Sequence, residues 1–118
     1  MIIGVGIDLV DLARFESTVN RTPKLIDRLF TETEREANLT SLAGKFAAKE
    51  AFVKALGGVD GLHWHEVEVA KHPSGAPYLL VTGETLEVAQ AAGIKSFHVS
   101  ISHDGGKAVS VVIAESGE

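Results

Sequence analysis

KFAAKEAFVKALG, residues 45–57, is the stretch of sequence that decides the fold. Its apolar spacing, followed over residues 42–56, predicts one long helix. The glycines at positions 57 and 58 are expected to end this helix, because glycine readily takes the left-handed conformation found at helix C-termini. In projection, Glu50 falls on the apolar stripe, beside Ala43, Phe46, Ala47 and Val53. A carboxylate there needs a partner, since an unpaired buried charge costs several kcal/mol or becomes neutral.

A second carboxylate lies in an apolar pattern near the start of the chain, in GVGIDLVDLARFE (residues 4–16). As a strand, residues 2–10 place Asp8 on the same face as Gly4 and Gly6. The other face carries Ile3, Val5, Ile7 and Leu9. We interpret the two glycines as leaving open space beside this carboxylate. It and the carboxylate of the long helix are the first candidates for a functional site.

The first half of the chain is predicted to be mainly helical after its opening strand. Asp11 is expected to cap a helix of about ten residues, and Pro23 to occupy the first position of the next helix. The segment Thr31-Glu32-Thr33-Glu34 fits a capping box for a short helix. The long helix is expected to begin at Thr40 or Ser41.

The second half is predicted to be mainly strands. Residues 58–65 have the composition of a loop, and residues 66–71 and 77–81 have that of a β-hairpin. Residues 82–93 are predicted to form a helix. The last two strands are expected at 96–102 and 107–114, joined by a turn at 103–106. The chain shows no internal repeat or low-complexity tract. We therefore predict an α+β fold, a single compact domain over residues 1–118 with an antiparallel sheet and a long central helix.

The strand at 107–114 has few polar positions on either face. Its apolar residues are Ala108, Val109, Val111, Val112, Ile113 and Ala114. A strand of this kind is typically buried on both sides. Another subunit could cover one of those sides, so the pattern points to an oligomer.

Composition limits the class of protein. The chain has 118 residues, of which 45% are hydrophobic, and this is enough for one real core. No apolar run approaches the roughly 18 residues of a membrane span, and no secretory leader is recognisable. The chain has no cysteine, which excludes disulfides and thiolate metal sites. We expect a soluble, cytoplasmic protein without a membrane partner.

Charge is distributed unevenly. Residues 1–54 hold eight Lys or Arg and eight Asp or Glu, whereas residues 55–118 hold three and eight, so the net charge of −5 comes from the second half. This balance argues against a general nucleic-acid binder, which needs a basic excess. The first half could still carry a local basic patch, or its cations could be solvated helix faces. The candidates are Arg14, Arg21, Lys24 and Arg28.

Two carboxylates without cysteine suit a hard cation such as Mg²⁺, which fills its shell with water and phosphate oxygens. That chemistry points to a phosphate substrate. Lys45, Lys49 and Lys54 lie within two turns of Glu50 and could neutralise phosphate charge. Two simpler interpretations stay open. Glu50 and Lys54 could form an ordinary i,i+4 ion pair, and the Lys49 stem could follow the apolar stripe to the surface.

The histidines give weaker signals. His63 and His65 have the spacing of two metal ligands on one strand face, but the sequence supplies no evident third ligand. His103 falls in the turn between the last two strands, where it can be a plain turn residue.

Five segments occur in the order and approximate spacing of one known family, the holo-acyl-carrier-protein synthases, which are the short class of 4′-phosphopantetheinyl transferases. They are GVGIDLVDLARFE (4–16), RLFTETE (28–34), KFAAKEAFVKALG (45–57), PSGAPYLLV (73–81) and SFHVSISHDGG (96–106). The chain resembles the family over nearly its whole length, and FAAKEAxxKAxG together with an early GIDxxxxxR is a specific combination. The resemblance implies transfer of 4′-phosphopantetheine from coenzyme A to a serine of apo-acyl-carrier protein. It also implies release of adenosine 3′,5′-bisphosphate and a role in fatty acid biosynthesis.

Carried over position by position, the resemblance implies roles for individual residues. Asp8 and Glu50 match the magnesium ligands, and Glu50 and Lys54 are the implied catalytic residues. At coenzyme A the resemblance implies Lys45, Lys54 and His103, and we expect Lys49 and Gly57 there as well. The residues implied at the acidic carrier protein are Arg14 and Arg21. The family is trimeric with active sites shared between neighbours, which implies a homotrimer and accounts for the apolar final strand.

One segment departs from the family pattern. After Gly57 the family usually has Thr-Gly, whereas this chain continues Gly58-Val59-Asp60-Gly61 and lacks that hydroxyl group.

Two other classes could use the same residues. A magnesium-dependent nucleotide pyrophosphatase would cleave its substrate with water, and a noncatalytic coenzyme-binding module would turn nothing over. An arginine-bearing docking helix is superfluous to both, so the sequence favours the transferase.

Overall fold

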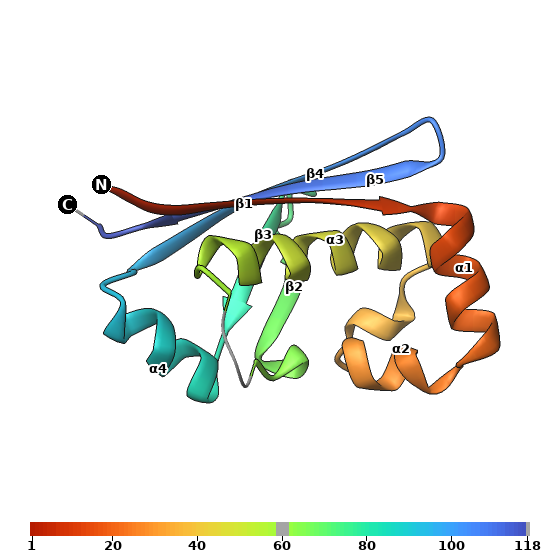
Figure 1. Ribbon diagram of the computed structural model, residues 1–118, viewed down its shortest axis with the longest axis horizontal. Helices are drawn as coiled ribbons and strands as arrows, with labels where there is room; N and C mark the ends of the chain where they lie inside the picture. Colours follow the sequence, from red (N-terminus) through yellow and green to blue (C-terminus); the bar gives the residue numbers. More distant parts are fainter. Residues whose placement is uncertain (59–61, 118) are drawn as a thin grey trace.

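Figure 1 shows a computed structural model of the protein, which describes residues 1–58 and 62–117. Within these residues a long helix, α3, lies under an antiparallel sheet with the strand order β1-β5-β4, and the hairpin β2-β3 lies beside the helix. The elements are β1 (Ile2–Asp11), α1 (Leu12–Arg21), α2 (Lys24–Leu29), α3 (Leu39–Ala55), β2 (Val67–Lys71), β3 (Pro77–Val81), α4 (Gly83–Ala91), β4 (Ser96–Asp104) and β5 (Lys107–Glu115), with short 3-10 helices at Glu34–Glu36 and Trp64–Glu66. The predicted α+β architecture with a long central helix is confirmed.

The backbone of β1 lies directly on α3. A Cβ atom at Gly4 would overlap the carbonyl oxygen of Ala55, and one at Gly6 would overlap that of Ala51. Only glycine permits this approach, because any side chain would push the strand and the helix apart. The expectation that the glycines leave open space beside Asp8 is therefore wrong, since the helix backbone fills that space.

α3 begins slightly before the predicted residues. Its first residue is Leu39, because the side chain of Asn38 caps the helix by accepting a 2.8 Å hydrogen bond from the N–H of Ser41. The predicted end is confirmed. The N–H groups of Gly57 and Gly58 bond carbonyls of the last turn in the Schellman arrangement.

The predicted capping box is confirmed by its two reciprocal hydrogen bonds. The N–H of Glu34 donates to the hydroxyl of Thr31 at 3.2 Å, and the N–H of Thr31 donates to the carboxylate of Glu34 at 2.9 Å. Pro23 lies just before α2 instead of at its first position.

The start of α4 and the segment before β2 differ from the prediction. Residues 58–65 are not all loop, because a 3-10 helix begins at Trp64. The helix predicted over 82–93 spans Gly83–Ala91, and Thr82 gives it no side-chain cap. Instead, the Glu66 carboxylate accepts hydrogen bonds from the N–H groups at the start of α4.

The hydrophobic core has two parts along α3. One part lies against α1 and α2 and includes Phe15, Phe30, Leu42, Ala43 and Ala47. The other lies toward α4 and includes Phe52, Val67, Ala89, Val112 and Ala114.

The two faces of the β1-β5-β4 sheet differ. The closed face packs on α3 and buries Ala108, Ser110, Val112 and Ala114 of β5. The apolar part of the open face consists of Val5, Ile7 and Leu9 of β1, which are 57%, 61% and 62% exposed, and of Val109, Val111 and Ile113 opposite them on β5. On β4 the same face carries the exposed polar residues His98, Ser100 and Ser102. Within one chain, β5 is therefore buried on one side only, and its second apolar side is uncovered.

No helix in residues 1–58 and 62–117 combines the length and the apolar character needed to cross a membrane.

Candidate functional site

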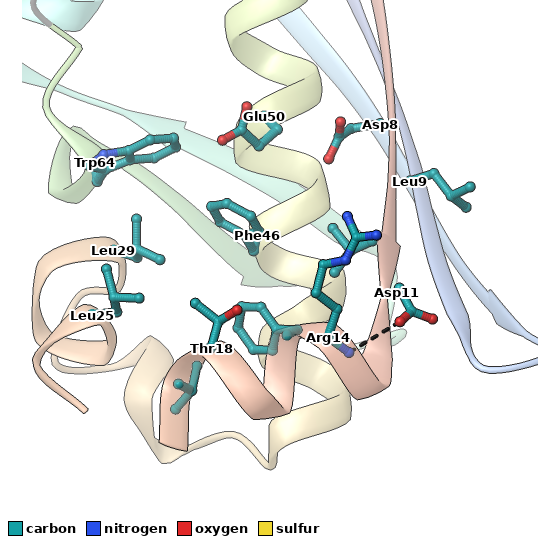
Figure 2. A pocket seen from close by; sticks show the side chains of 13 residues that line it. Asp8, Leu9, Asp11, Arg14, Thr18, Leu25, Leu29, Phe46, Glu50 and Trp64 are labelled. Atoms are coloured by element: carbon teal, nitrogen blue, oxygen red, sulfur yellow. Dashed lines mark hydrogen bonds between the residues drawn. The ribbon is translucent and has the colours of Figure 1, made fainter. Parts of the chain in front are cut away.

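An apolar pocket of about 410 Å³ opens where α1, α2 and α3 approach the end of β1. Its apolar walls include Phe15, Val19, Leu25, Leu29, Phe46 and Trp64. Figure 2 shows Asp8 and Glu50 at one end of the pocket, Asp8 on β1 and Glu50 on α3. The structure thus brings together the two carboxylates that the sequence singled out.

The Asp8 carboxylate is held by Lys54. The Nζ atom of Lys54 lies 3.0 Å from Oδ1 of Asp8 and donates to the carbonyl oxygen of Ile7 at 3.0 Å. The Lys54 side chain remains 54% exposed, whereas that of Asp8 is 18% exposed. The simple i,i+4 ion pair between Glu50 and Lys54 is not formed, because Lys54 reaches across to the strand.

Glu50 is half-buried, and its carboxylate has no hydrogen bond or ion pair with any residue that the structure describes. Burial and the nearby Asp8 charge raise the pKa of Glu50 above its ordinary value, and Lys54 opposes that rise. A cation near both carboxylates would relieve this repulsion. Across the described residues no group of three or more Asp, Glu, His or Cys side chains gathers as a metal cage. The pair therefore fits an ion that takes two carboxylates and completes its shell with water and substrate oxygens, as Mg²⁺ does.

The start of α1 borders the same pocket. Asp11 accepts a 2.8 Å bond from Nζ of Lys107 and a 3.1 Å bond from the N–H of Arg14. These bonds, the one from Lys107 first, hold the pKa of Asp11 below its ordinary value. Figure 2 shows Arg14 extending from α1 toward Asp8. Arg21, at the exposed last residue of α1, lies outside the pocket.

Lys45 and His103 lie in a second cavity, of about 190 Å³, which shares no lining residue with the first. The Nζ atom of Lys45 donates to the carbonyl oxygen of Val69 at 3.1 Å, and burial lowers the pKa of Lys45. The Nε2 atom of His103 lies 3.1 Å from the carbonyl oxygen of Thr40. Lys71, which the sequence did not single out, also lines this cavity. Of the predicted coenzyme residues, Lys45 and His103 are therefore separated from the carboxylate pair within one chain, whereas Lys54 bonds Asp8.

Lys49 is fully buried. Its Nζ atom pairs with Oε1 of Glu34 at 2.6 Å and donates to the carbonyl oxygens of Leu29 and Trp64 at 2.8 and 3.0 Å. Burial lowers the pKa of Lys49, and the Glu34 charge opposes that change. Both interpretations of Lys49 are corrected. Its stem does not carry the ammonium to the surface, and an ammonium enclosed by these partners is not placed to contact a coenzyme.

The structure also shows the surroundings of Gly57 and of the two histidines His63 and His65. Gly57 has a φ of 82° at the end of α3, and among the described residues no atom beyond its two chain neighbours lies within 4 Å of where its Cβ would be. His63 lies 3.3 Å from the carboxylate of Glu84, and His65 lies 2.6 Å from the carbonyl oxygen of Asp27. The two rings thus face different partners and do not share a metal site.

Sequence analysis missed the walls of the pocket. Trp64 falls in the segment expected to be a loop, and the chain's having one tryptophan was the available signal. The altered segment after Gly57 includes residues 59–61, which lie outside the described residues.

Comparison with known proteins gives one family. Residues 4–112 match the model of the 4′-phosphopantetheinyl transferase superfamily. A holo-[acyl-carrier-protein] synthase of Beutenbergia cavernae is 52% identical over 115 residues, which cover 98% of this chain and 99% of that protein. The crystal structure of holo-[acyl-carrier-protein] synthase from Neisseria meningitidis matches with a TM-score of 0.90 at 28% identity, over 98% of this chain and 99% of that one. The Helicobacter pylori holo-[acyl-carrier-protein] synthase, solved in complex with coenzyme A, matches with a TM-score of 0.83 at 35% identity, over 94% of this chain and 99% of that one.

The chain therefore belongs to the 4′-phosphopantetheinyl transferase superfamily and, within it, to the holo-[acyl-carrier-protein] synthases. The family resemblance found in the sequence is confirmed, and the protein is an enzyme of the phosphopantetheinyl transferase class.

Proposed function

We propose that this protein transfers the 4′-phosphopantetheine group of coenzyme A to a serine of apo-acyl-carrier protein, releases adenosine 3′,5′-bisphosphate and supports fatty acid biosynthesis. The observation that carries the proposal is the pair Asp8 and Glu50 at the end of an apolar pocket, with Lys54 bound to Asp8. The coenzyme A complex of the Helicobacter pylori relative supports the same donor here. We take residues 1–118 as one transferase domain that acts in the cytoplasm.

Asp8 and Glu50 would hold Mg²⁺. Glu50 has no competing partner among the described residues, and Lys54 bonds only one of the two Asp8 oxygens. When bound, Mg²⁺ would neutralise charge on the pyrophosphate and stabilise the bisphosphate leaving group.

The remaining chemistry falls to side chains of the chain itself. Lys54 is exposed enough to reach a phosphate oxygen, where its charge would stabilise the transferred phosphoryl group. Glu50 is our candidate for accepting the serine proton through a water molecule, because its carboxylate has no hydrogen bond or ion pair with any other described residue.

We also propose a homotrimer with active sites shared between neighbours. The carboxylate pair and the basic cavity of Lys45, Lys71 and His103 are separate in one chain. The open face of the sheet is an uncovered apolar surface through which copies could associate. In such an assembly the carboxylates of one chain and the basic cavity of the next would hold the coenzyme phosphates between them.

The carrier protein is proposed to dock on α1. Arg14 and Arg21 give this helix positive charge, which would attract an acidic partner to a protein of net charge −5. Arg21→Glu is the sharper test, because Arg21 lies outside the pocket. We expect carrier affinity to fall roughly tenfold at low salt, and less at high salt, with coenzyme A affinity unchanged.

A matched charge reversal at the exposed Lys95 should leave both affinities as they are. Equal loss of carrier and coenzyme affinity in Arg21→Glu would remove α1 as the docking helix.

The function is tested by the intact mass of an apo-carrier protein after incubation with coenzyme A and Mg²⁺. We expect the wild type to add one phosphopantetheine group, and Asp8→Ala and Glu50→Ala to lose at least about a hundredfold in rate while keeping their circular dichroism. Glu87→Ala, an exposed carboxylate on α4, is the control. Cleavage of coenzyme A without a carrier would indicate a pyrophosphatase, and binding without turnover would indicate a noncatalytic module.

A further inference from the structure

We propose that the buried ion pair of Lys49 and Glu34 positions the pocket: it fixes the wall formed by Leu29 and Trp64 relative to Glu50. Lys49 and Glu34 are then positioning residues, which act on the substrate through the wall that they hold. The inference rests on the proposed function only in taking this pocket as part of the transferase site.

Every polar atom of the pair has a partner. The Lys49 ammonium donates to Glu34 and to two backbone carbonyls, which uses its three N–H groups. On Glu34, Oε1 also accepts from the N–H of Thr31 at 2.9 Å, and Oε2 accepts from the N–H of Val69 at 2.7 Å. The ammonium also lies 5.3 Å from the centre of the Phe30 ring. Such a network is fully directional, so it admits one arrangement of the segments that it joins.

The two carbonyls bound by Lys49 belong to pocket-lining residues. Leu29 is the last residue of α2, and Trp64 begins a 3-10 helix. Both elements are short. α2 has six residues and no side-chain cap, and the 3-10 helix has three residues. Because helices of this length have little stability of their own, their positions depend on tertiary anchors such as the Lys49 ammonium.

Lys49 and Glu50 are consecutive on α3, so their side chains leave the helix about 100° apart. Lys49 points to the segments that carry the wall, and Glu50 points to the end of the pocket. Figure 2 shows Trp64 and Leu29 opposite Phe46 and Glu50, and the Trp64 and Phe46 ring centres lie 6.0 Å apart. The turn of α3 that carries Lys49 and Glu50 therefore sets the width of the pocket beside the Glu50 carboxylate.

The energetics favour a positioning function over a purely stabilising one. Replacing a buried ion pair by apolar residues of similar volume is often neutral or stabilising, because desolvation of the charges offsets their attraction. Two apolar residues in place of Lys49 and Glu34 could not form the hydrogen bonds that Lys49 donates to the carbonyl oxygens of Leu29 and Trp64. Removing the charges should therefore displace the wall even where the chain stays folded.

The experiment uses the neutral double variant Glu34→Gln/Lys49→Met, with fluorescence of the single tryptophan as a direct readout of the wall. We expect Trp64 emission to move to longer wavelength and kcat/KM for carrier modification to fall roughly tenfold or more. Most of that loss should be a rise in KM, since Asp8, Glu50 and Lys54 are untouched. If the double variant does not fold, Lys49→Met alone, which also removes the hydrogen bonds to Leu29 and Trp64, is tested by the same two measurements.

Ile94→Ala is the matched control, because Ile94 is buried in the other part of the core and does not line the pocket. It should lower the melting temperature without changing Trp64 emission or KM. The proposal is overturned if the charge-free variant keeps wild-type emission and a kcat/KM within twofold, or if Ile94→Ala changes both equally. Should the wild type transfer nothing, the proposed function fails, and the Trp64 emission alone still decides whether the pair positions the wall.

Discussion

The closed and open faces of the β1-β5-β4 sheet are built from the same strands but from side chains of different size. On the closed face, β1 presents Gly4 and Gly6, and the helix backbone lies against them. On the open face the same strand presents Val5, Ile7 and Leu9, each more than half exposed. Apart from its aspartates, β1 is apolar on both faces, so hydrophobicity alone does not distinguish them. The difference teaches that side-chain size decides which face accepts a helix and which is left for a larger surface.

The closed face also determines the geometry of the site. Asp8 follows Gly6 on that face, one step beyond the region of backbone contact. Because the glycines let α3 approach so closely, the Glu50 side chain comes near enough for the Asp8 charge to raise its pKa. The distance between the Asp8 and Glu50 carboxylates thus depends on the two glycines of β1, which have no side chain to hold α3 away.

The largest effect is expected for Val112→Glu. Val112 is fully buried on the closed face, and an unpaired carboxylate there should cost about 5 kcal/mol or more, enough to unfold a domain of ordinary stability. Loss of the far-UV circular dichroism of the purified chain is the measurement. A wild-type melting temperature in Val112→Glu would contradict the assignment of Val112 to a buried, closed face of the sheet.

Val111→Glu, one residue earlier and on the open face, should leave the chain folded but separate the proposed trimer. Light scattering should then give a mass near the 12.5 kDa of one chain, and transferase activity should disappear with the assembly. A wild type that already has this mass and is fully active would exclude the shared site.

Gly6→Ala and Ile7→Ala sharpen the comparison on neighbouring positions. The added methyl of Gly6→Ala meets the backbone of α3, and we expect a loss of about 3 kcal/mol at every protein concentration. Ile7→Ala should instead lower the melting temperature in a concentration-dependent way, because its proposed neighbours belong to another chain. Thermal melts over a hundredfold range of concentration would separate the two cases.

The smallest effect is expected in the titration of Glu50, followed by carboxyl carbon NMR. Asp8→Asn should lower the pKa of Glu50 by removing a repelling charge, and Lys54→Met should raise it by removing an attracting one. Since the folded-state pKa lies above the unfolded value, the contribution of Glu50 favours folding at low pH and is lost as the pH rises through the folded-state pKa. An unchanged midpoint in Asp8→Asn would mean that the carboxylates do not interact.

Sequence patterns predicted what depends on local spacing. The long helix, its glycine end, the capping box and the pair Asp8 and Glu50 all follow from residues near one another or from family motifs. The environment of Lys49 could not be predicted in this way. Helical projection showed that Lys49 lies on the apolar stripe but not that Glu34 would meet it there, because that contact depends on how a 3-10 turn packs on α3.

The second cavity was missed for a similar reason. It forms only when the β2-β3 hairpin and the end of β4 meet the first turns of α3, and these segments are far apart in the chain. The closeness of β1 to α3 was likewise not evident. A glycine in a strand pattern can mean open space or close packing, and only the tertiary structure decides between them.

The pairing of β1 with β5 has a consequence for how the chain folds. Within the described residues β1 is hydrogen-bonded to no other strand, and Asp11 and Lys107, which close one end of that ladder, are 96 positions apart. Closing so long a loop is entropically unfavourable, and topologies rich in such distant contacts fold slowly. Until β5 arrives, the branched residues of β1 have no strand beside them, so during synthesis β1 is made long before the strand that protects it from aggregation.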